Sequence, residues 1–205
     1  MTAPGSPSPP APGSGPPTIR VDGGAVLRPW RPADAAPLYE AVDGSREHLA
    51  EWLDWVDGYS LERAQQFIDG ARERSERGAA LELALDVGGA IGGSCGFVDI
   101  VPAHGEVEIG YWLGLPFTGR GLMTRTTAAL TDYAFDAMGM HRVAIAVYGG
   151  NLRSRAIPER LGFRAEGAFV AARRHRDRWH DLAWYGVLAD EWHARSADRS
   201  AGAPA

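Results

Sequence analysis

The spacing of apolar residues along the chain predicts its helices. The clearest case is 60–78, where apolar residues recur every three or four positions and would share one helix face. Those residues are Leu61, Ala64, Ile68 and Ala71. Ser60 can cap the start of this helix and Gly78 can end it. Helical patterns also cover 34–42, 120–138 and 151–163, and 45–56 has the pattern of a helix or a turn.

From residue 80 the pattern changes to the short apolar runs and alternation that are typical of strands. Strands are predicted at 25–30, 80–87, 90–100, 106–113, 141–148, 164–174 and 179–188. Gly88 and Gly89 form a turn between two of them. Short loops favour antiparallel pairing, whereas a strand reached through a helix can pair in parallel. The chain is therefore predicted to have an α+β fold, with one mixed, mostly antiparallel sheet flanked by helices.

The two ends of the chain lack these patterns. Residues 1–17 are almost entirely Pro, Gly, Ser and Ala, which cannot bury enough apolar surface to offset chain entropy. We expect a disordered leader there, and a disordered tail of similar composition at 195–205. The folded part is predicted as a single domain over 18–194, as the length of 205 residues suggests.

Composition excludes several classes of protein. The formal net charge is -5, whereas a general nucleic-acid-binding surface is basic. Cys95 is the single cysteine, so neither an internal disulfide nor a zinc set is expected, and we predict no metal site. The N-terminus lacks the basic start and apolar core of a signal peptide, and no apolar run approaches bilayer length. We expect a cytoplasmic protein without a membrane or nucleic-acid partner.

A glycine-rich stretch, Gly119–Gly121, separates a predicted strand from a predicted helix, as in several phosphate-binding loops. A P-loop requires Lys, and this chain has none. A dinucleotide-binding fingerprint requires a third glycine where Thr124 stands, and a carboxylate near the end of the next strand, where Tyr148 stands. Two interpretations remain. The backbone N–H groups hold a diphosphate at a helix N-terminus, or the stretch is a plain turn.

Three segments in order carry a family resemblance: "VLRPWRPADAAPLYEAV", "HGEVEIGYWLGLPFTGRGLMTRTTAALTDYAFDAMGMHRVAIAVYGGNLRSRAIPERLGFRAEG" and "RRHRDRWHDLAWYGVL". They resemble the GNAT superfamily of N-acetyltransferases, in its ribosomal-protein (RimJ/RimL-like) branch, over residues 20–190. The resemblance implies the GNAT sheet, in which the fourth strand (106–113) and the fifth strand (141–148) splay apart. It also implies acetyl transfer from acetyl-CoA to an amine without a covalent enzyme intermediate.

The resemblance also implies a set of cofactor-binding residues. The family's phosphate signature is Gln/Arg-x-x-Gly-x-Gly/Ala, and here Thr118, Gly121 and Met123 take its first, central and last places. The first and last depart from the strict form. Because such a loop acts mainly through its main-chain donors, this puts in doubt only a side-chain contact from Thr118. The expected set is Trp112, Leu113, Thr118, Gly119, Arg120, Gly121, Leu122, Met123, Thr124, Asn151, Ser154 and Arg155.

Two side chains are predicted to take part in the chemistry. Glu106 and Glu108 share a face of one strand, and Glu108 is the predicted base or the holder of a water that acts as base. The pair can also be solvated carboxylates on an exposed face. The resemblance implies that Ser154 protonates the leaving sulfur, although Asn151 and Ser154 also fit a helix cap and its first turn. In part of the family a Glu in the region that matches Arg173 is suggested as the base. Arg173 stands there in this chain, so the role of base does not transfer to this position.

The resemblance leaves the amine acceptor open. A protein N-terminal α-amine is implied by the branch. A small-molecule amine (an antibiotic, an amino sugar or a polyamine) is the alternative, because function depends on the site and not on the fold. A non-catalytic acyl-CoA-binding module is a second alternative. Acetyl-CoA is the expected cofactor, CoA the product, and a homodimer is implied at the family level.

Overall fold

This computed structural model describes residues 16–21 and 23–201, with side chains described up to residue 195. Most of the predicted leader 1–17 therefore lies outside the described residues, as does the end of the predicted tail. The strands are β1 (Ile19–Val21), β2 (Ala25–Pro29), β3 (Leu81–Val87), β4 (Ala90–Val101), β5 (Glu106–Leu113), β6 (Arg142–Tyr148), β7 (Arg164–His175) and β8 (Arg178–Leu188). The α-helices are α1 (Ala35–Asp43), α2 (Arg46–Ala50), α3 (Leu61–Glu76), α4 (Leu122–Asp132), α5 (Leu152–Leu161) and α6 (Ala189–Ala201).

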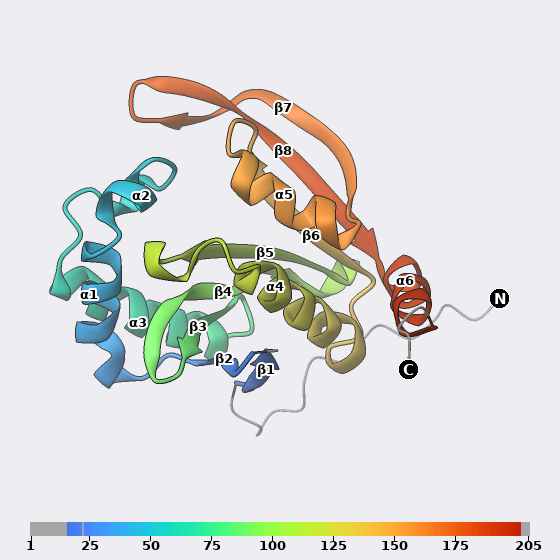
Figure 1. The fold of residues 1–205 in the computed structure, drawn as a ribbon, viewed down its shortest axis with the longest axis horizontal. Coiled ribbons are helices and arrows are strands. Elements are labelled where there is room, and N and C mark those ends of the chain that lie inside the picture. The colour runs from blue at the N-terminus through green and yellow to red at the C-terminus, as the bar shows by residue number, and fades with distance from the viewer. Residues whose placement is uncertain (1–15, 22, 202–205) are drawn as a thin grey trace.

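The strands form one sheet in the order β1-β2-β3-β4-β5-β6-β8-β7 (Figure 1). Every neighbouring pair is antiparallel except β5 and β6, which are parallel. The predicted α+β fold with a mixed, mostly antiparallel sheet is confirmed. The sequence did not predict β1, because its three residues are too few to show a period.

The strands β5 and β6 separate soon after they begin. Parallel pairing joins them at only three positions, which are Glu106–Arg142, Val107–Val143 and Glu108–Ala144. Both strands continue beyond this point, to Leu113 and Tyr148. The splay expected between the fourth and fifth predicted strands is therefore confirmed. The edge of β5 over 109–113 has no strand beside it among the described residues, so its backbone polar groups can pair with a ligand.

A bulge in β4 lies close to the point of separation. The register between β4 and β5 shifts between Phe97 and Asp99, which leaves Val98 as the extra residue. A Cβ atom at Gly110 would stand 2.5 Å from Val98 Cγ1. Glycine at position 110 is therefore required by the close approach of Val98.

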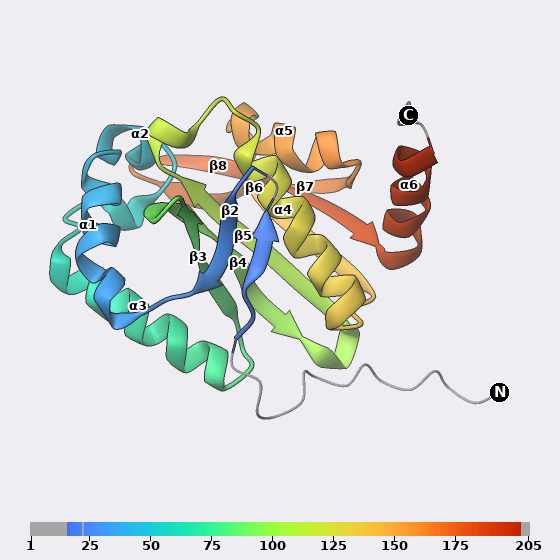
Figure 2. The same cartoon turned by 60° about the horizontal axis from the view of Figure 1, so that its bottom comes forward.

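The two faces of the sheet carry different hydrophobic cores (Figure 2). On one face α4 packs over β1, β4 and β5, and α5 packs over β6, whose Val143, Ile145 and Val147 alternate into that core. On the other face α1 and α3 pack over β3 and β4, where Ala84 and Ile91 are buried. The strands next to the place where β5 and β6 part are thus covered by helices on both faces of the sheet.

Helix α3 agrees closely with its prediction. The Ser60 Oγ accepts a hydrogen bond from the backbone N–H of Arg63 at 3.2 Å, so Ser60 is the N-cap. Ala64, Ile68 and Ala71 are buried against the sheet. Leu61 stays exposed in the first turn, so the apolar face begins one turn later than predicted.

The C-terminal part of the chain forms α6, which extends beyond the predicted domain boundary at 194. Trp192 is buried, and its Nε1 donates a hydrogen bond to Asp132 at 2.6 Å. The guanidinium of Arg195 donates to the backbone oxygen of Gly162. These contacts attach α6 to the domain, although its own sequence has little apolar content. Within the described part of the chain, no helix is long and apolar enough to span a membrane.

Candidate active site

The loop before α4 exposes a row of backbone donors. Gly119 and Gly121 have positive φ angles of 77° and 65°, a conformation that disfavours a Cβ atom. Gly121 is the residue just before α4, and its carbonyl accepts the first helical hydrogen bond from Arg125. The six N–H groups from Gly119 to Thr124 donate to no acceptor within the described residues. The helix dipole adds to their positive potential, so they form an anion-binding site.

The side chains of the loop have other uses. Leu122 and Met123 are buried in the core under α4, so each can offer a ligand only its backbone N–H. Thr118 Oγ1 donates a hydrogen bond to the backbone oxygen of Leu115 at 2.9 Å. Its side chain is thus turned into its own turn, in line with the doubt about a contact from this residue. Thr124 is half-buried on α4.

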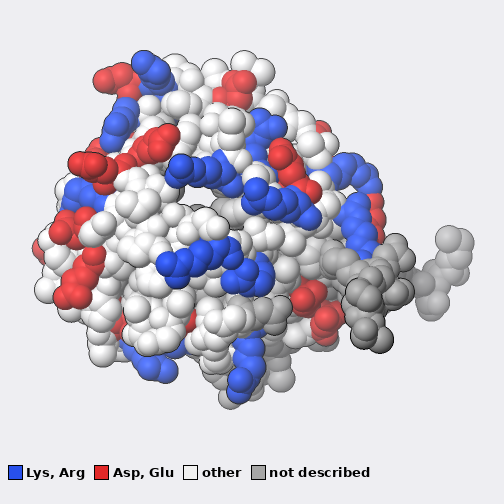
Figure 3. Space-filling model, viewed as in Figure 1, with Lys and Arg blue, Asp and Glu red and all other residues white. Residues whose placement is uncertain are grey.

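Positive charge surrounds this row of donors. The segments 114–131 and 149–158, which face one another across the separated strands, contain arginines and no carboxylates. Arg120 and Arg153 are exposed, and the Arg125 guanidinium donates to the backbone oxygen of Arg120 at 2.9 Å. Figure 3 shows Arg side chains on both sides of an opening near the centre of this face, between the start of α5 and the loop before α4. The opening is suited to a polyanion.

Two hydroxyl groups meet at the start of α5. Asn151 Oδ1 accepts a hydrogen bond from the backbone N–H of Ser154 at 3.1 Å, so the predicted cap is present. Ser154 Oγ donates to the Tyr111 hydroxyl at 3.2 Å, and that hydroxyl donates to the backbone oxygen of Ser154 at 3.0 Å. Burial raises the pKa of Tyr111, although the hydrogen bond with Ser154 opposes this. Tyr111 is therefore a neutral phenol that fixes the position of Ser154.

The sequence indicated Ser154 but missed Tyr111. Tyr111 follows Val107 and Ile109 on the same face of β5, so its position resembles that of an ordinary core aromatic residue. Its partner comes 43 residues later, in the first turn of α5, and meets it where β5 and β6 have separated. No local pattern in the sequence records such a contact.

Glu108 occupies the last paired position before β5 and β6 separate. Burial is the main cause that raises the pKa of its carboxyl, the charges of Asp99 and Glu106 raise it further, and Arg173 lowers it. Arg173 therefore lies close enough to act on Glu108, from the β7–β8 hairpin. The carboxyl is half-buried, so the alternative of a fully solvated pair is wrong for Glu108.

The neighbouring Glu106 has a structural role. Its carboxylate accepts a hydrogen bond from Arg142 Nε at 3.0 Å. The same guanidinium makes two hydrogen bonds of 2.6 Å to Glu166 of β7. These three side chains cross β5, β6 and β7 over Gly186 of β8, where a Cβ atom would stand 2.1 Å from Arg142 Nη1. They join the strands at the closed end of the splay.

The last two β5 residues of the predicted set lie on the free edge of that strand. Trp112 and Leu113 pair with β4 on one side and have no strand on the other within the described residues. The Trp112 ring packs on the α1–α3 side, with its centroid 6.0 Å from that of Trp55. Both residues can therefore offer their backbone groups to an extended ligand.

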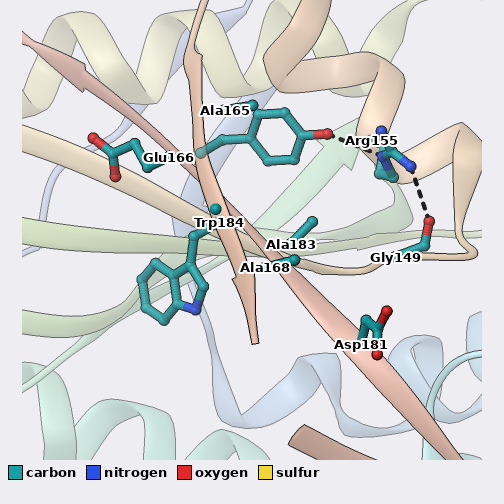
Figure 4. A pocket seen from close by; sticks show the side chains of 10 residues that line it. Gly149, Arg155, Ala165, Glu166, Ala168, Asp181, Ala183 and Trp184 are labelled. Atoms are coloured by element: carbon teal, nitrogen blue, oxygen red, sulfur yellow. Dashed lines mark hydrogen bonds between the residues drawn. The ribbon is translucent and has the colours of Figure 1, made fainter. Parts of the chain in front are cut away.

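Arg155 is the member of the predicted set that lies apart. Its guanidinium donates to the Tyr185 hydroxyl at 3.0 Å, to the backbone oxygen of Gly149 at 3.1 Å and to Glu159 at 3.3 Å. It lines a cavity of about 480 Å³ against β7 and β8, shown in Figure 4. Neither Ser154 nor Glu108 lines that cavity. In this arrangement Arg155 fixes the loop after β6, and a phosphate would have to displace one of its partners.

Comparison with known proteins agrees with this geometry. The family described as "Acetyltransferase (GNAT) domain" matches residues 25–164, which is more than half of the chain. The chain belongs to the GNAT acetyltransferase family. It is an acetyl-CoA-dependent N-acetyltransferase, and its anion-binding loop and splayed strands fit the phosphates and the extended arm of that cofactor.

The relatives of this acetyltransferase include ribosomal-protein modifiers. "Putative ribosomal N-acetyltransferase YdaF" of Bacillus subtilis is 31% identical over 178 residues, which are 85% of this chain and 97% of that protein. "Ribosomal-protein-serine acetyltransferase" of Escherichia coli is 25% identical, over 84% of this chain and 97% of that protein. A solved structure of the RimL ribosomal L7/L12 α-N-protein acetyltransferase with coenzyme A is 26% identical, with a TM-score of 0.81 over 85% of this chain and 99% of that one.

Proposed function

We propose that this acetyltransferase acts on the α-amine of a protein N-terminus. The observation that carries the proposal is the position of Glu108, a half-buried carboxyl where β5 and β6 separate, next to the free edge of β5. The similarity to proteins named as ribosomal-protein acetyltransferases, over nearly their whole length, supports this choice of acceptor.

The backbone donors of the loop before α4 bind the cofactor's phosphates in this proposal. The N–H groups from Gly119 to Thr124 point at the diphosphate, and Arg120 adds charge. The edge of β5 at Trp112 and Leu113 pairs with the pantetheine arm, and Asn151 contacts that arm while it caps α5. Acetyl-CoA supplies an acetyl group already activated as a thioester.

Glu108 acts as the base. An α-amine has a pKa near 8, so at neutral pH most of it carries a proton that must leave before the nitrogen can attack. A carboxyl with a raised pKa accepts that proton more readily, either directly or through one water. The amine nitrogen then bonds to the acetyl carbon and loses a second proton to water, and the bond between that carbon and sulfur breaks with its electron pair on the sulfur. A backbone N–H near Leu113 polarises the carbonyl oxygen during this step.

Ser154 gives its hydroxyl proton to the leaving sulfur, and its oxygen takes a proton back from water. The departing thiolate needs a proton, and Ser154 Oγ holds one in its hydrogen bond to Tyr111. Tyr111 is a positioning residue because it holds both the hydroxyl and the backbone oxygen of Ser154. Arg155 keeps the loop before α5 in place through Gly149.

A panel of acceptors tests the choice of amine. Release of CoA thiol should occur with a peptide that has a free α-amine, and should stop when the same peptide is blocked at that amine. Mass spectrometry should find one added acetyl group, on the N-terminal residue. Acetylation of spermidine or an amino sugar, together with inert peptides, would refute the proposed acceptor.

A polyamine is the second candidate, because Asp99 and Glu108 form a negative region that could hold a cation. The proposal also includes a cytoplasmic location, where ribosomal proteins are made, and a homodimer, as the family resemblance implies. Sedimentation at several protein concentrations would test the dimer.

A further inference from the structure

The turn between β7 and β8 carries a dense group of cations. Arg173, Arg174, Arg176 and Arg178 all have exposed side chains, in a chain whose net charge is -5. Figure 1 shows this hairpin extending past β6 and over α2. The sequence "RRHRDR" alone favours a solvated hairpin turn over a substrate clamp, so only its surroundings can support the second interpretation.

The cations of this turn are poorly neutralised. Among the described residues only Asp177 comes within ion-pair distance of any of the four, at 3.5 Å from Arg174, and that carboxylate is itself fully exposed. Arg173 donates only to the neighbouring backbone oxygen of Ala172. By contrast, Arg28 and Arg142, which hold parts of the fold together, each have two carboxylate partners.

The turn is held in place by His175, a buried residue that lies between these arginines in the sequence. His175 is 5% exposed, and its Nδ1 lies 2.5 Å from Asp54 Oδ1. The two atoms are within ion-pair distance without hydrogen-bond alignment, so neither ring nitrogen has a hydrogen-bond partner. The ring also contacts Tyr148 and His180, with centroids 6.0 and 6.1 Å away. The arginines are thus presented on a fixed support.

The turn end of the hairpin lies near the proposed catalytic carboxyl. Arg173 pairs with His180 close to the turn, and its charge lowers the pKa of Glu108. The exposed ring of Trp179 pairs in register with Arg174 and adds apolar area next to the cations. A chain that delivers its end to Glu108 would therefore pass this surface with the residues that follow its N-terminus.

We infer that the β7–β8 hairpin is a docking surface for an acidic segment of the acceptor protein, downstream of the acetylated residue. The inference rests on the proposed function, and it specifies further that the acceptor protein carries negative charge near its N-terminus. Arginines bind carboxylates through paired N–H donors, and a local positive patch steers acidic partners even on an acidic protein. A polycationic acceptor would be repelled at the same surface.

Two peptides of about twelve residues test the inference, long enough to reach past the active site. They share the N-terminal half, and the second half contains Asp and Glu in one and Asn and Gln in the other. The readout is the ratio of their kcat/KM values in a thiol-release assay. We expect the enzyme to favour the acidic peptide about tenfold at about 50 mM salt, and the ratio to fall towards one at about 500 mM.

A triple variant, Arg174→Gln, Arg176→Asn and Arg178→Gln, should bring the ratio close to one. Asn is chosen because Arg176 has a φ of 53°, which Asn tolerates. The matched control is Arg20→Gln, Arg72→Gln and Arg77→Gln, which makes the same charge change on β1, on α3 and just after α3, and should keep the ratio.

A ratio of one in the unchanged enzyme, with both peptides acetylated, overturns the docking surface and leaves the proposed function intact. If the control variant lowers the ratio of kcat/KM values as much as the hairpin variant does, the docking surface is overturned as well. The preference would then depend on the net charge of the protein and not on the hairpin. Thiol release with spermidine and with neither peptide overturns both proposals.

Discussion

The Tyr111–Ser154 pair allows the sharpest test of the proposed chemistry. The change is Tyr111→Phe, which removes one hydroxyl and keeps the ring. That hydroxyl makes two hydrogen bonds, of 3.0 Å to the Ser154 backbone oxygen and 3.2 Å from Ser154 Oγ. Both distances are long for bonds between oxygens, so together they contribute about 1.5 kcal/mol.

If that energy orients the serine, kcat should fall about tenfold, since each 1.4 kcal/mol changes a rate by that factor. Ser154→Ala removes the proton donor itself and should cost about a hundredfold or more. The acetyl-CoA KM should change little in either variant, because the phosphate site lies in the loop before α4. Tyr111→Phe should also lower Tm by about 3–5 °C, because a buried carbonyl loses its partner.

Steady-state thiol release at saturating acetyl-CoA measures these effects. In the Ser154→Ala background Tyr111→Phe should have no further effect on kcat, because the two residues act as one unit. Tyr133→Phe is the matched control, since the Tyr133 hydroxyl has no hydrogen-bond partner among the described residues, and its kcat should be unchanged. An equal fall in kcat in both backgrounds, or none in the native one, would refute the reasoning.

Three further predictions follow from the site and the sheet. Gly121→Asp should raise the acetyl-CoA KM at least tenfold, because a carboxylate would enter the row of backbone donors at a φ of 65°; an unchanged KM would remove this loop from the cofactor site. Glu108→Gln should remove the acid limb of the pH–rate profile. It should also raise Tm at pH 7, and this gain should vanish as the pH falls towards about 4, because the fold favours the neutral carboxyl; matching Tm values at pH 7 would contradict the burial of this charge. Gly110→Ala should cost about 1–3 kcal/mol in the free energy of unfolding, since its Cβ would stand 2.5 Å from Val98 Cγ1. Val98→Ala should restore most of that loss in urea unfolding curves, and a failed rescue would place the strain elsewhere.

Local patterns predicted the regular elements well. The cap at Ser60 and the turn at Gly88–Gly89 depend on neighbours in sequence, and both are present, with positive φ at both glycines. The separation of β5 and β6 came from the family resemblance, because apolar spacing holds no information about which strand edges remain unpaired. Helix α6 continues past residue 194, and the sequence pattern does not show this because the helix is held by contacts of Trp192 and Arg195 with distant residues.

The parts of the site that lie close together in the sequence could be predicted, and the parts that depend on contacts between distant residues could not. The donors from Gly119 to Thr124 lie in one loop, and two glycines indicated them. Glu106 and Glu108 looked alike in the sequence, because they alternate on one strand. Only the fold distinguishes them, since Arg142 neutralises the first and burial perturbs the second. Tyr111 could not be separated from the core by pattern, because its function depends on a helix that follows much later.

The short contact between β5 and β6 has a mechanical consequence. Among the described residues, three residue pairs, the backbone hydrogen bonds of His141 and Arg142 to Gly105, and the bridge through Arg142 join the strands of the two halves of the sheet. Beyond that end the facing backbone edges of β5 and β6 do not pair with each other, so an extended molecule laid between them would act as the missing strand. The bound cofactor would then supply hydrogen bonds that the sheet itself lacks. The enzyme should therefore be more stable with acetyl-CoA bound and less stable once CoA has left.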